Sequence, residues 1–324
     1  MDILRFRPLL KHTIWGGERI PRLKRLDIDD HDVGESWEIS GLAGDESVVD
    51  GGPYDGMTIN ELIRRERHHL LGRDNYRRFG DEFPLLVKFI DAHDDLSIQV
   101  HPDDVTARRH GHRRGKTELW YVMQSEPGAR LYSGLRRWIT PRQYKNMVAK
   151  STITDALALY DVTEGDVFYI PAGRIHAILR GCFITEIQQT CNLTYRIYDY
   201  NRTDKNGQRR QLHTQQAAES IDYAVHNDYR THYSPRPNQA VPLVASPYFT
   251  VALYDINRSV TIDYSAIDSF IILVCVAGEG LLSLAADSHT TQQPFCLGQT
   301  VLLPATTRAL NITGNLKLLE AYIP

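Results

Sequence analysis

The chain of 324 residues is 42% hydrophobic and 24% charged, a composition that is typical of globular proteins and excludes a disordered or fibrous chain. Its 37 basic and 40 acidic residues give a formal charge of −3, so no overall positive field would attract nucleic acid or an anionic membrane. No apolar run approaches the roughly 20 residues of a membrane span, and the N-terminus lacks the pattern of a signal peptide. We therefore expect a cytoplasmic protein without nucleic-acid or membrane partners.

The predicted elements are mostly short strands, separated by turn residues at intervals of roughly ten, as in antiparallel sandwiches and barrels. Two small helices interrupt them. The first, over residues 58–72, has an apolar face, and the second begins with Thr140 as N-cap and Pro141 in the first helical position. The strands are predicted at residues 83–90, 96–101, 117–123, 129–135, 166–171, 177–181, 182–190, 248–256, 270–278, 280–286 and 300–305.

A polar, proline-bearing stretch over residues 223–242 interrupts the strand pattern and is predicted to be a linker. It would separate an N-terminal catalytic domain, residues 1–222, from a C-terminal domain, residues 243–324. The sequence therefore predicts a mainly β protein of two domains with small helical additions.

Two distant segments share a pattern of residues. Residues 163–178 and 296–312 both read glycine, polar residues, an apolar run, proline, a turn and another strand, which suggests a duplicated β-unit. The first copy carries His176 where the second has Ala309 or a neighbour. If both units belong to barrels, only the first keeps polar groups that could hold a metal.

The four cysteines form no CxxC pair. Scattered cysteines are more typical of reduced thiols in a cytosolic enzyme than of a disulfide framework. A metal held by cysteine is therefore not expected. The cysteines are Cys182, Cys191, Cys275 and Cys296.

Four polar side chains form a candidate metal site. Gln99 and His101 are two residues apart on a predicted strand and therefore share a face. Glu118 and His176 each begin another strand. Brought together in a barrel, these groups would form a nitrogen and oxygen site of the kind that suits zinc.

On spacing alone, structural roles explain the same residues better than metal binding does, because most histidines near strand ends are surface or hydrogen-bonded residues. Gln99 could pair with the backbone, His101 could cap a turn, and Glu118 could form a salt bridge with Lys116. Because the four ligands do not form a local motif, spacing leaves the choice open.

Cationic side chains near these positions suit an anionic ligand. Arg196 lies on a tyrosine-rich strand, where it could bind a phosphate or an oxyanion, or pair with Asp199. Lys88 lies within an apolar run, where an unpaired ammonium would be costly, so it is expected to reach a cavity or a partner. Lys116 lies two residues before Glu118.

The residues that carry these features resemble a known family, the type I phosphomannose isomerases of the cupin superfamily. The resemblance covers roughly residues 5–205, and the C-terminal third matches mainly in its cupin-like rhythm. The matching phrases are "TIWGG", "GESWEISG", "PLLVKFIDAHDDLSIQVHPDD", "GKTELWYV", "IPAGRIHAI" and "EIQQTCNLTYRIYDYNR".

The resemblance implies two cupin-type jelly-roll barrels and a zinc-dependent isomerase that interconverts mannose 6-phosphate and fructose 6-phosphate through an enediol. It implies one Zn²⁺ per chain, a sugar phosphate as the small-molecule partner, and a monomer or homodimer. The implied zinc ligands are Gln99, His101, Glu118 and His176. Arg196 aligns with the family's active-site arginine, and Lys88 and Lys116 align with its pocket lysines, so Arg196 and Lys116 are the implied catalytic residues and all three bind substrate.

One position departs from the family pattern, because Asn192 stands where many relatives have an aspartate. The general base also stays open, since Glu118 would be bound to the metal. Two other functions remain possible at this point: another metallo-cupin enzyme such as an iron-dependent dioxygenase, and a non-catalytic sugar-phosphate sensor.

Overall fold

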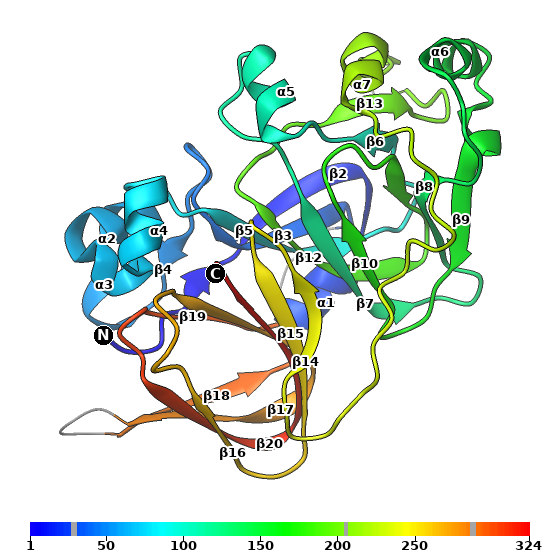
Figure 1. Cartoon of the computed structure of the whole chain (residues 1–324). Helices are drawn as coiled ribbons and strands as arrows, with labels where there is room; N and C mark the ends of the chain where they lie inside the picture. Colours follow the sequence, from blue (N-terminus) through cyan, green and yellow to red (C-terminus); the bar gives the residue numbers. More distant parts are fainter. Residues whose placement is uncertain (27–30, 204–206, 286–289) are drawn as a thin grey trace. The chain divides into compact units, whose positions relative to one another are not determined.

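The computed structural model describes residues 1–26, 31–203, 207–285 and 290–324. The chain divides into two compact units that are discontinuous in sequence (Figure 1). We call residues 10–36 and 88–231 the site unit, and residues 1–9, 37–87 and 232–324 the terminal unit. The predicted domain boundaries at residues 222 and 242 follow chain order and stay a prediction. The last residue of the strand predicted at 280–286 lies outside the described residues.

The site unit contains strands from two sheets. One sheet has the order β10-β7-β12-β5-β3-β2, and the other has the order β13-β6-β11-β8-β9. Strands β2, β3 and β5 have residues in both units. The strands of the first sheet are β2 (Leu9–Gly17), β3 (Val33–Ser40), β5 (Leu85–Asp91), β7 (Glu118–Ser125), β10 (Val167–Ile170) and β12 (Cys182–Gln189). Those of the second are β6 (Ile98–Val100), β8 (Arg130–Leu135), β9 (Leu157–Asp161), β11 (His176–Ile178) and β13 (Tyr195–Tyr198).

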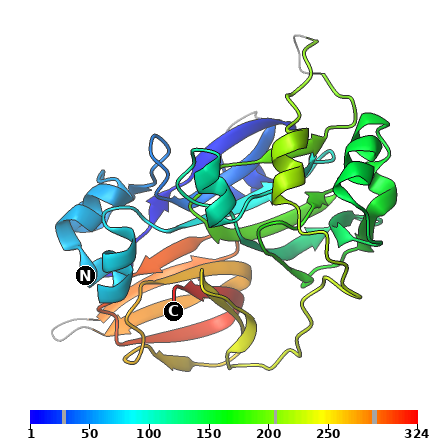
Figure 2. The same cartoon turned by 45° about the horizontal axis from the view of Figure 1, so that its top comes forward.

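The two faces of the second sheet have different environments, because strand residues alternate in direction. Ile98 and Val100 of β6 pack in one apolar cluster with Tyr144 and Ala217 from the helices α6 and α7. The intervening residue, Gln99, therefore points to the other face. The helices α6 and α7 lie side by side (Figure 1, Figure 2). The helices of this unit are α1 (Arg19–Lys24), α5 (Asp104–Arg109), α6 (Pro141–Ala149), η2 (Ile153–Ala156) and α7 (Thr214–Ser220).

A second apolar cluster fills the space between the two sheets of the site unit. It joins Trp120 of β7 and Ile184 of β12 in one sheet to Ile178 of β11 in the other. Each of these three residues has a buried polar residue two positions away, on the same face of its strand. These polar residues are Glu118, Glu186 and His176, respectively. Along these strands, the face between the sheets therefore carries apolar side chains at one position and ionisable or polar side chains two residues away.

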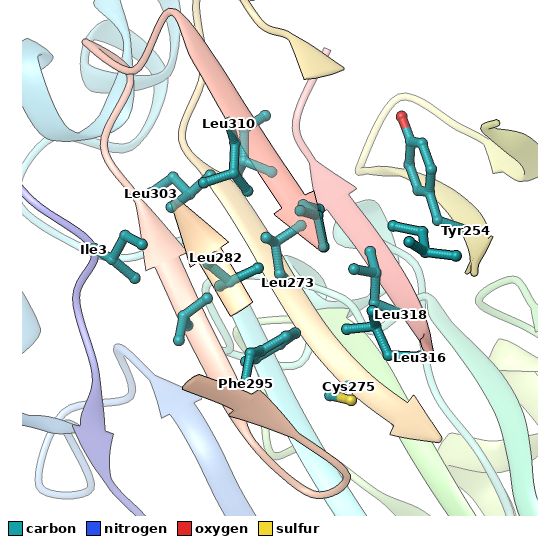
Figure 3. Packing of buried hydrophobic residues seen from close by; sticks show 14 of the residues in the cluster. Ile3, Tyr254, Leu273, Cys275, Leu282, Phe295, Leu303, Leu310, Leu316 and Leu318 are labelled. Atoms are coloured by element: carbon teal, nitrogen blue, oxygen red, sulfur yellow. The ribbon is translucent and has the colours of Figure 1, made fainter. Parts of the chain in front are cut away.

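The terminal unit contains a sheet of order β14-β15-β20-β17-β18, with β16 paired to β20 and β19 paired to β17. Its inward side chains form one apolar cluster, in which Leu273, Leu282, Phe295 and Leu318 lie together (Figure 3). Its elements are β1 (Phe6–Arg7), β4 (Val48–Val49), η1 (Gly52–Tyr54), α2 (Ile59–Glu66), α3 (His68–Leu71), α4 (Arg73–Phe79), β14 (Val241–Ala245), β15 (Thr250–Ile256), β16 (Val260–Asp263), β17 (Ile271–Ala285), β18 (Thr290–Cys296), β19 (Thr300–Leu303) and β20 (Ala309–Tyr322).

The predicted mainly β class is confirmed, with two corrections. The described strand pairings leave every sheet open, so the expected barrels are not closed by hydrogen bonds. The strands predicted at 270–278 and 280–286 are one strand, β17, with a bulge between Cys275 and Ala277. Close to the bulge, Gly278 adopts φ 70°, and a Cβ at this residue would lie 2.0 Å from the Asn315 carbonyl oxygen. Gly278 therefore allows close approach of two strands at a bulge and does not form a turn.

Both predicted helices form. Thr140 caps α6 by accepting a hydrogen bond from the Gln143 backbone N–H, and Pro141 begins the helix. The helix predicted at 58–72 is broken at Arg67, where φ is 53°, into α2 and α3. Its apolar residues Ile59, Leu62, Ile63 and Leu70 are all buried.

The duplicated β-unit appears in both units of the structure. Strand β10 is followed by Pro171, and β11 begins five residues later at His176. Strand β19 is followed by Pro304, and β20 begins five residues later at Ala309. His176 and Ala309 therefore hold equivalent places in the order of elements, although His176 is buried and Ala309 is exposed.

We predict that Phe295→Ala destabilises the protein by about 3–5 kcal/mol, because Phe295 is fully buried in the terminal-unit cluster and its loss leaves a cavity. Urea denaturation followed by circular dichroism measures the change. The control is Gln292→Ala on the same strand, whose exposed side chain should change stability by less than about 0.5 kcal/mol. Equal midpoints for the two variants would contradict the packing described here.

Candidate active site

Three ionisable side chains converge between the sheets of the site unit. His101, Glu118 and His176 are all buried, and one potential ligand atom from each lies within 4.8 Å of the others. Glu118 belongs to β7 in one sheet, whereas His176 belongs to β11 in the other and His101 directly follows β6. The cluster therefore depends on how the two sheets face each other.

Backbone carbonyl groups orient both imidazole rings. Nδ1 of His101 lies 2.8 Å from the Leu193 carbonyl oxygen, and Nδ1 of His176 lies 2.8 Å from that of Arg174. A carbonyl can only accept, so Nδ1 carries the proton in each ring and Nε2 keeps its lone pair. Such outer contacts are typical of histidines that bind a metal.

The distances between these atoms fit a shared metal ion. Nε2 of His176 lies 3.4 Å from Glu118 Oε1, and Nε2 of His101 lies 3.6 Å from Glu118 Oε2. Two ligands that are each ~2.1 Å from a tetrahedral ion are separated by ~3.4 Å. Among the described residues, His101 Nε2 and Glu118 Oε1 have no hydrogen-bond partner although both are buried. These three residues, together with Gln99, would hold a divalent ion.

Gln99 lies beside His176, because the two residues are paired across strands β6 and β11. Its side-chain amide is 3.3 Å from Nε2 of His176. The two ends of a glutamine amide are interchangeable in shape, so the carbonyl oxygen can occupy this position as a ligand. The structure thus brings together all four residues that the sequence singled out as metal ligands.

A layer of paired charges lies next to this cluster. Lys116 Nζ is 2.9 Å from Glu118 Oε2 and 3.5 Å from Glu186 Oε1. Lys88 Nζ is 3.4 Å from the same Glu186 oxygen and 3.2 Å from Glu35 Oε2. Three carboxylates and two ammonium groups give the layer a formal charge of −1, which a divalent cation would change to +1.

Burial and neighbouring charges set the protonation of this layer. Burial lowers the pKa of His176 to about 3 and the pKa of His101 well below its usual range, so both rings are neutral and can bind a metal. Burial raises the pKa of Glu118, and the nearby charge of Glu186 adds to this effect. A cation bound at the site would counteract that rise.

Glu186 and Lys116 stay charged, because each is paired with groups of opposite charge. Burial by itself would raise the pKa of Glu186, but Lys116 and Lys88 outweigh burial and lower that pKa. Burial by itself would lower the pKa of Lys116, but Glu118 and Glu186 raise it. Trp120 Nε1 donates a 2.8 Å hydrogen bond to Glu186 Oε2, which leaves Oε1 directed at the lysines.

A cavity of about 620 Å³ opens onto the layer. Its volume lies within the range of small-molecule sites. Lys88, Lys116 and Arg196, the three residues expected to bind substrate, line it, together with Gln99 and the exposed Asn192. Arg196 is paired with Gln99 across β13 and β6, next to the metal ligands. The further lining residues are His12, Thr13, Ile14, Trp15, Asp32, Glu35, Ile90, Leu96, Ser97, Ile178, Glu186, Thr194 and Arg210.

The strand that carries Arg196, β13, is short. Tyr195 and Ile197 are buried, and Arg196 and Tyr198 lie on the opposite face, but β13 ends at Tyr198. Tyr200 has φ 54° and lies outside the strand. The alternative pairing of Arg196 with Asp199 does not appear among the described ion pairs, since Asp199 binds other arginines.

Sequence reasoning missed Glu35 and Glu186. Glu186 is the lone carboxylate of β12, and Glu35 shares β3 with Glu38, so no local motif marks either residue as part of a site. The available signal was an acidic residue in an otherwise apolar or amide-rich run, "CFITEIQQ" for Glu186. A charged residue in such a run needs a partner, and the lysines of other strands provide it.

Two further findings concern the whole described chain. The four cysteines are free thiols. Among the described residues, no helix combines the length and the apolar character needed to cross a membrane.

We predict that His176→Ala lowers the affinity for a divalent cation by more than about a hundredfold, because losing a ligand should cost more than the 10–100-fold typical of a group that only orients one. Competition with a chromogenic chelator measures the affinity. The control is the exposed His112→Ala, which removes an imidazole outside the cluster and should leave the affinity unchanged. Equal affinities for the two variants would show that the cluster does not bind metal.

Comparison with known proteins identifies relatives along almost the whole chain. Residues 3–127 match the family model "Phosphomannose isomerase type I, catalytic domain", and residues 240–323 match "Mannose-6-phosphate isomerase, cupin domain". The chain is 33% identical over 310 residues to a mannose-6-phosphate isomerase of Streptococcus mutans, covering 95% of this chain and 94% of the relative. It is 31% identical to the Bacillus subtilis mannose-6-phosphate isomerase ManA, covering 98% of each.

A solved structure supports the same assignment. The crystal structure of the mannose 6-phosphate isomerase from Bacillus subtilis matches with a TM-score of 0.88 and 30% identity, over 99% of each chain. The resemblance stated from sequence motifs is therefore confirmed. The ionisable cluster, the adjoining lysines and these relatives agree, and the chain belongs to the type I phosphomannose isomerases, the mannose-6-phosphate isomerase family of isomerases.

Proposed function

We propose that this protein interconverts mannose 6-phosphate and fructose 6-phosphate, with one zinc ion per chain. The observation that carries the proposal is the convergence of His101, Glu118 and His176 next to two buried lysines at a cavity large enough for a sugar phosphate. The names of the relatives agree with mannose 6-phosphate as one of the two substrates. A cytoplasmic location and a monomer or homodimer stay predictions.

Zinc fits the donor set. Two neutral imidazoles, a carboxylate and an amide oxygen are the nitrogen and oxygen ligands that zinc accepts, and Gln99, His101, Glu118 and His176 would hold it. When bound, zinc supplies a Lewis acid that stabilises negative charge on a substrate oxygen. The chain's own residues must then bind the substrate and move the proton.

Conversion of an aldose to a ketose moves a proton between adjacent carbons through an enediol, so it needs a base and a proton donor. Glu186 suits the base: it lines the cavity, it is not one of the proposed ligands, and the lysines keep it ionised. Lys116 suits the donor, because it stays protonated and lies in the same cavity wall. Trp120 keeps Glu186 in one orientation.

Lys88 and Arg196 complete the binding of an anionic substrate. Both line the cavity. Lys88 lies between Glu35 and Glu186, whereas Arg196 has no carboxylate partner among the described ion pairs and donates to a backbone carbonyl. The guanidinium can therefore bind a phosphate or a developing oxyanion.

The purified protein should convert mannose 6-phosphate to fructose 6-phosphate, lose this activity on treatment with a strong chelator, and regain it with zinc. A coupled assay for fructose 6-phosphate follows the reaction, and elemental analysis gives the metal per chain. Turnover that survives complete metal removal would contradict the proposed role of zinc. No turnover by protein with one bound zinc would favour a sugar-phosphate sensor.

Replacing the proposed base tests the proton route. Glu186→Gln should lower kcat by about 10²–10⁴-fold while zinc content is unchanged, since the amide cannot accept the proton. Steady-state kinetics and elemental analysis on the same preparation measure both.

The matched control is Glu35→Gln, which changes the other carboxylate bound to Lys88 and also lines the cavity. Its effect on kcat should be much smaller, because Glu186 and not Glu35 is the proposed base. An equal loss in both variants would mean that Glu186 acts only through the charge of Lys88.

A further inference from the structure

A second basic side chain lies in the cavity beside Arg196. The segment 211–213 runs along Arg196, held by three hydrogen bonds. Arg196 Nη1 donates to the Gln211 carbonyl at 3.0 Å, the His213 N–H donates to the Arg196 carbonyl at 2.7 Å, and the Arg196 N–H donates to His213 Nδ1 at 3.1 Å. These bonds place the preceding residue, Arg210, at the same cavity, which it lines.

Asp199 holds the guanidinium of Arg210 in a two-point contact. Nε donates to Oδ2 at 2.8 Å and Nη2 donates to Oδ1 at 2.5 Å. Asp199 is only 5% exposed, so the contact is shielded from water. A fork held at two points has a fixed orientation, which is the condition for recognising an oxyanion with the donors that remain.

The wall that carries the two arginines has unsatisfied positive charge. Nε of Arg196 is buried and, among the described residues, has no hydrogen-bond partner. Burial lowers the pKa of Arg196, and the charge of Arg210 contributes next, as expected of two like charges close together. Two guanidinium groups in one cavity wall, with a free buried donor, provide a site for a dianion.

We infer that Arg210 binds the phosphate of the substrate together with Arg196, and that Asp199 is the positioning residue that orients Arg210. The inference rests on the proposed function, because the phosphate is that of the proposed substrate. The two ends of the substrate would then bind to different groups. The carbons that exchange the proton would lie at the lysines and the metal ligands, and the phosphate would bind to the two arginines.

Arg202 provides a matched comparison within the same cluster. It also donates to Asp199, at 2.7 Å, and its other end pairs with Asp94 at 3.2 Å. Unlike Arg210, it does not line the cavity. Removing Arg202 therefore changes the charge around Asp199 without removing a donor from the proposed phosphate site.

The test compares Arg210→Gln with Arg202→Gln in zinc-loaded protein. Arg210→Gln should raise the KM for mannose 6-phosphate and the inhibition constant of inorganic phosphate by the same factor, roughly tenfold to a hundredfold, with kcat changed less than threefold. Arg210→Lys should recover part of the loss. Arg202→Gln should leave the inhibition constant within about twofold of the unaltered protein. Phosphate constants that rise equally in both glutamine variants, or in neither, would overturn the inference.

Asp199→Asn tests the positioning role. It keeps both arginines but removes the carboxylate, so phosphate affinity should fall in the same direction as in Arg210→Gln, and combining the two changes should add little. Fully additive losses would show that Asp199 does not act through Arg210. Titration calorimetry with inorganic phosphate reads the site without turnover, so a protein that binds phosphate through Arg210 but does not isomerise would refute the proposed reaction and not the phosphate site.

Discussion

Burying charge between two sheets is the constraint on which the site depends. An isolated ionised group in such a place would be neutralised, because its transfer from water is costly. Here each buried charge has partners from other strands: Lys116 between Glu118 and Glu186, and Lys88 between Glu186 and Glu35. The arrangement still carries one negative charge too many, and a divalent cation at the neighbouring imidazoles would reverse that sign for an anionic ligand.

The alternation of strand residues explains how one small sheet has both a core and a site. On β6, Ile98 and Val100 pack against the helices, whereas Gln99 faces the opposite sheet. The duplicated β-unit shows that the same order of elements can also occur without a site. In place of His176, the terminal unit has the exposed Ala309, and the neighbouring Leu310 joins the apolar core of that unit (Figure 3). One backbone pattern thus serves a chemical site in one unit and packing in the other.

Features that depend on residues close together in the sequence were predictable, whereas features that depend on distant residues were not. The shared face of Gln99 and His101 follows from the two-residue period of a strand, and the cap at Thr140 follows from its immediate neighbours. The strand 271–285 was divided in two because glycines near its middle suggested a turn, when they allow close approach across a bulge. Glu186 and Arg210 were missed for another reason. Each becomes part of the site only through partners that are far away in sequence or in a different strand.

The sequence by itself determined the mainly β class, the family, the two capped or amphipathic helices and the residue types available for a nitrogen and oxygen site. These depend on local periodicity and on motifs that each occupy a few consecutive residues. Only the tertiary structure decided that Glu118 meets the two imidazoles across facing sheets, that the lysines share Glu186, and that Arg210 stands beside Arg196. The physical reason is that ion pairs and metal geometry depend on distances of a few ångströms between strands, and strand spacing along the chain does not encode those distances.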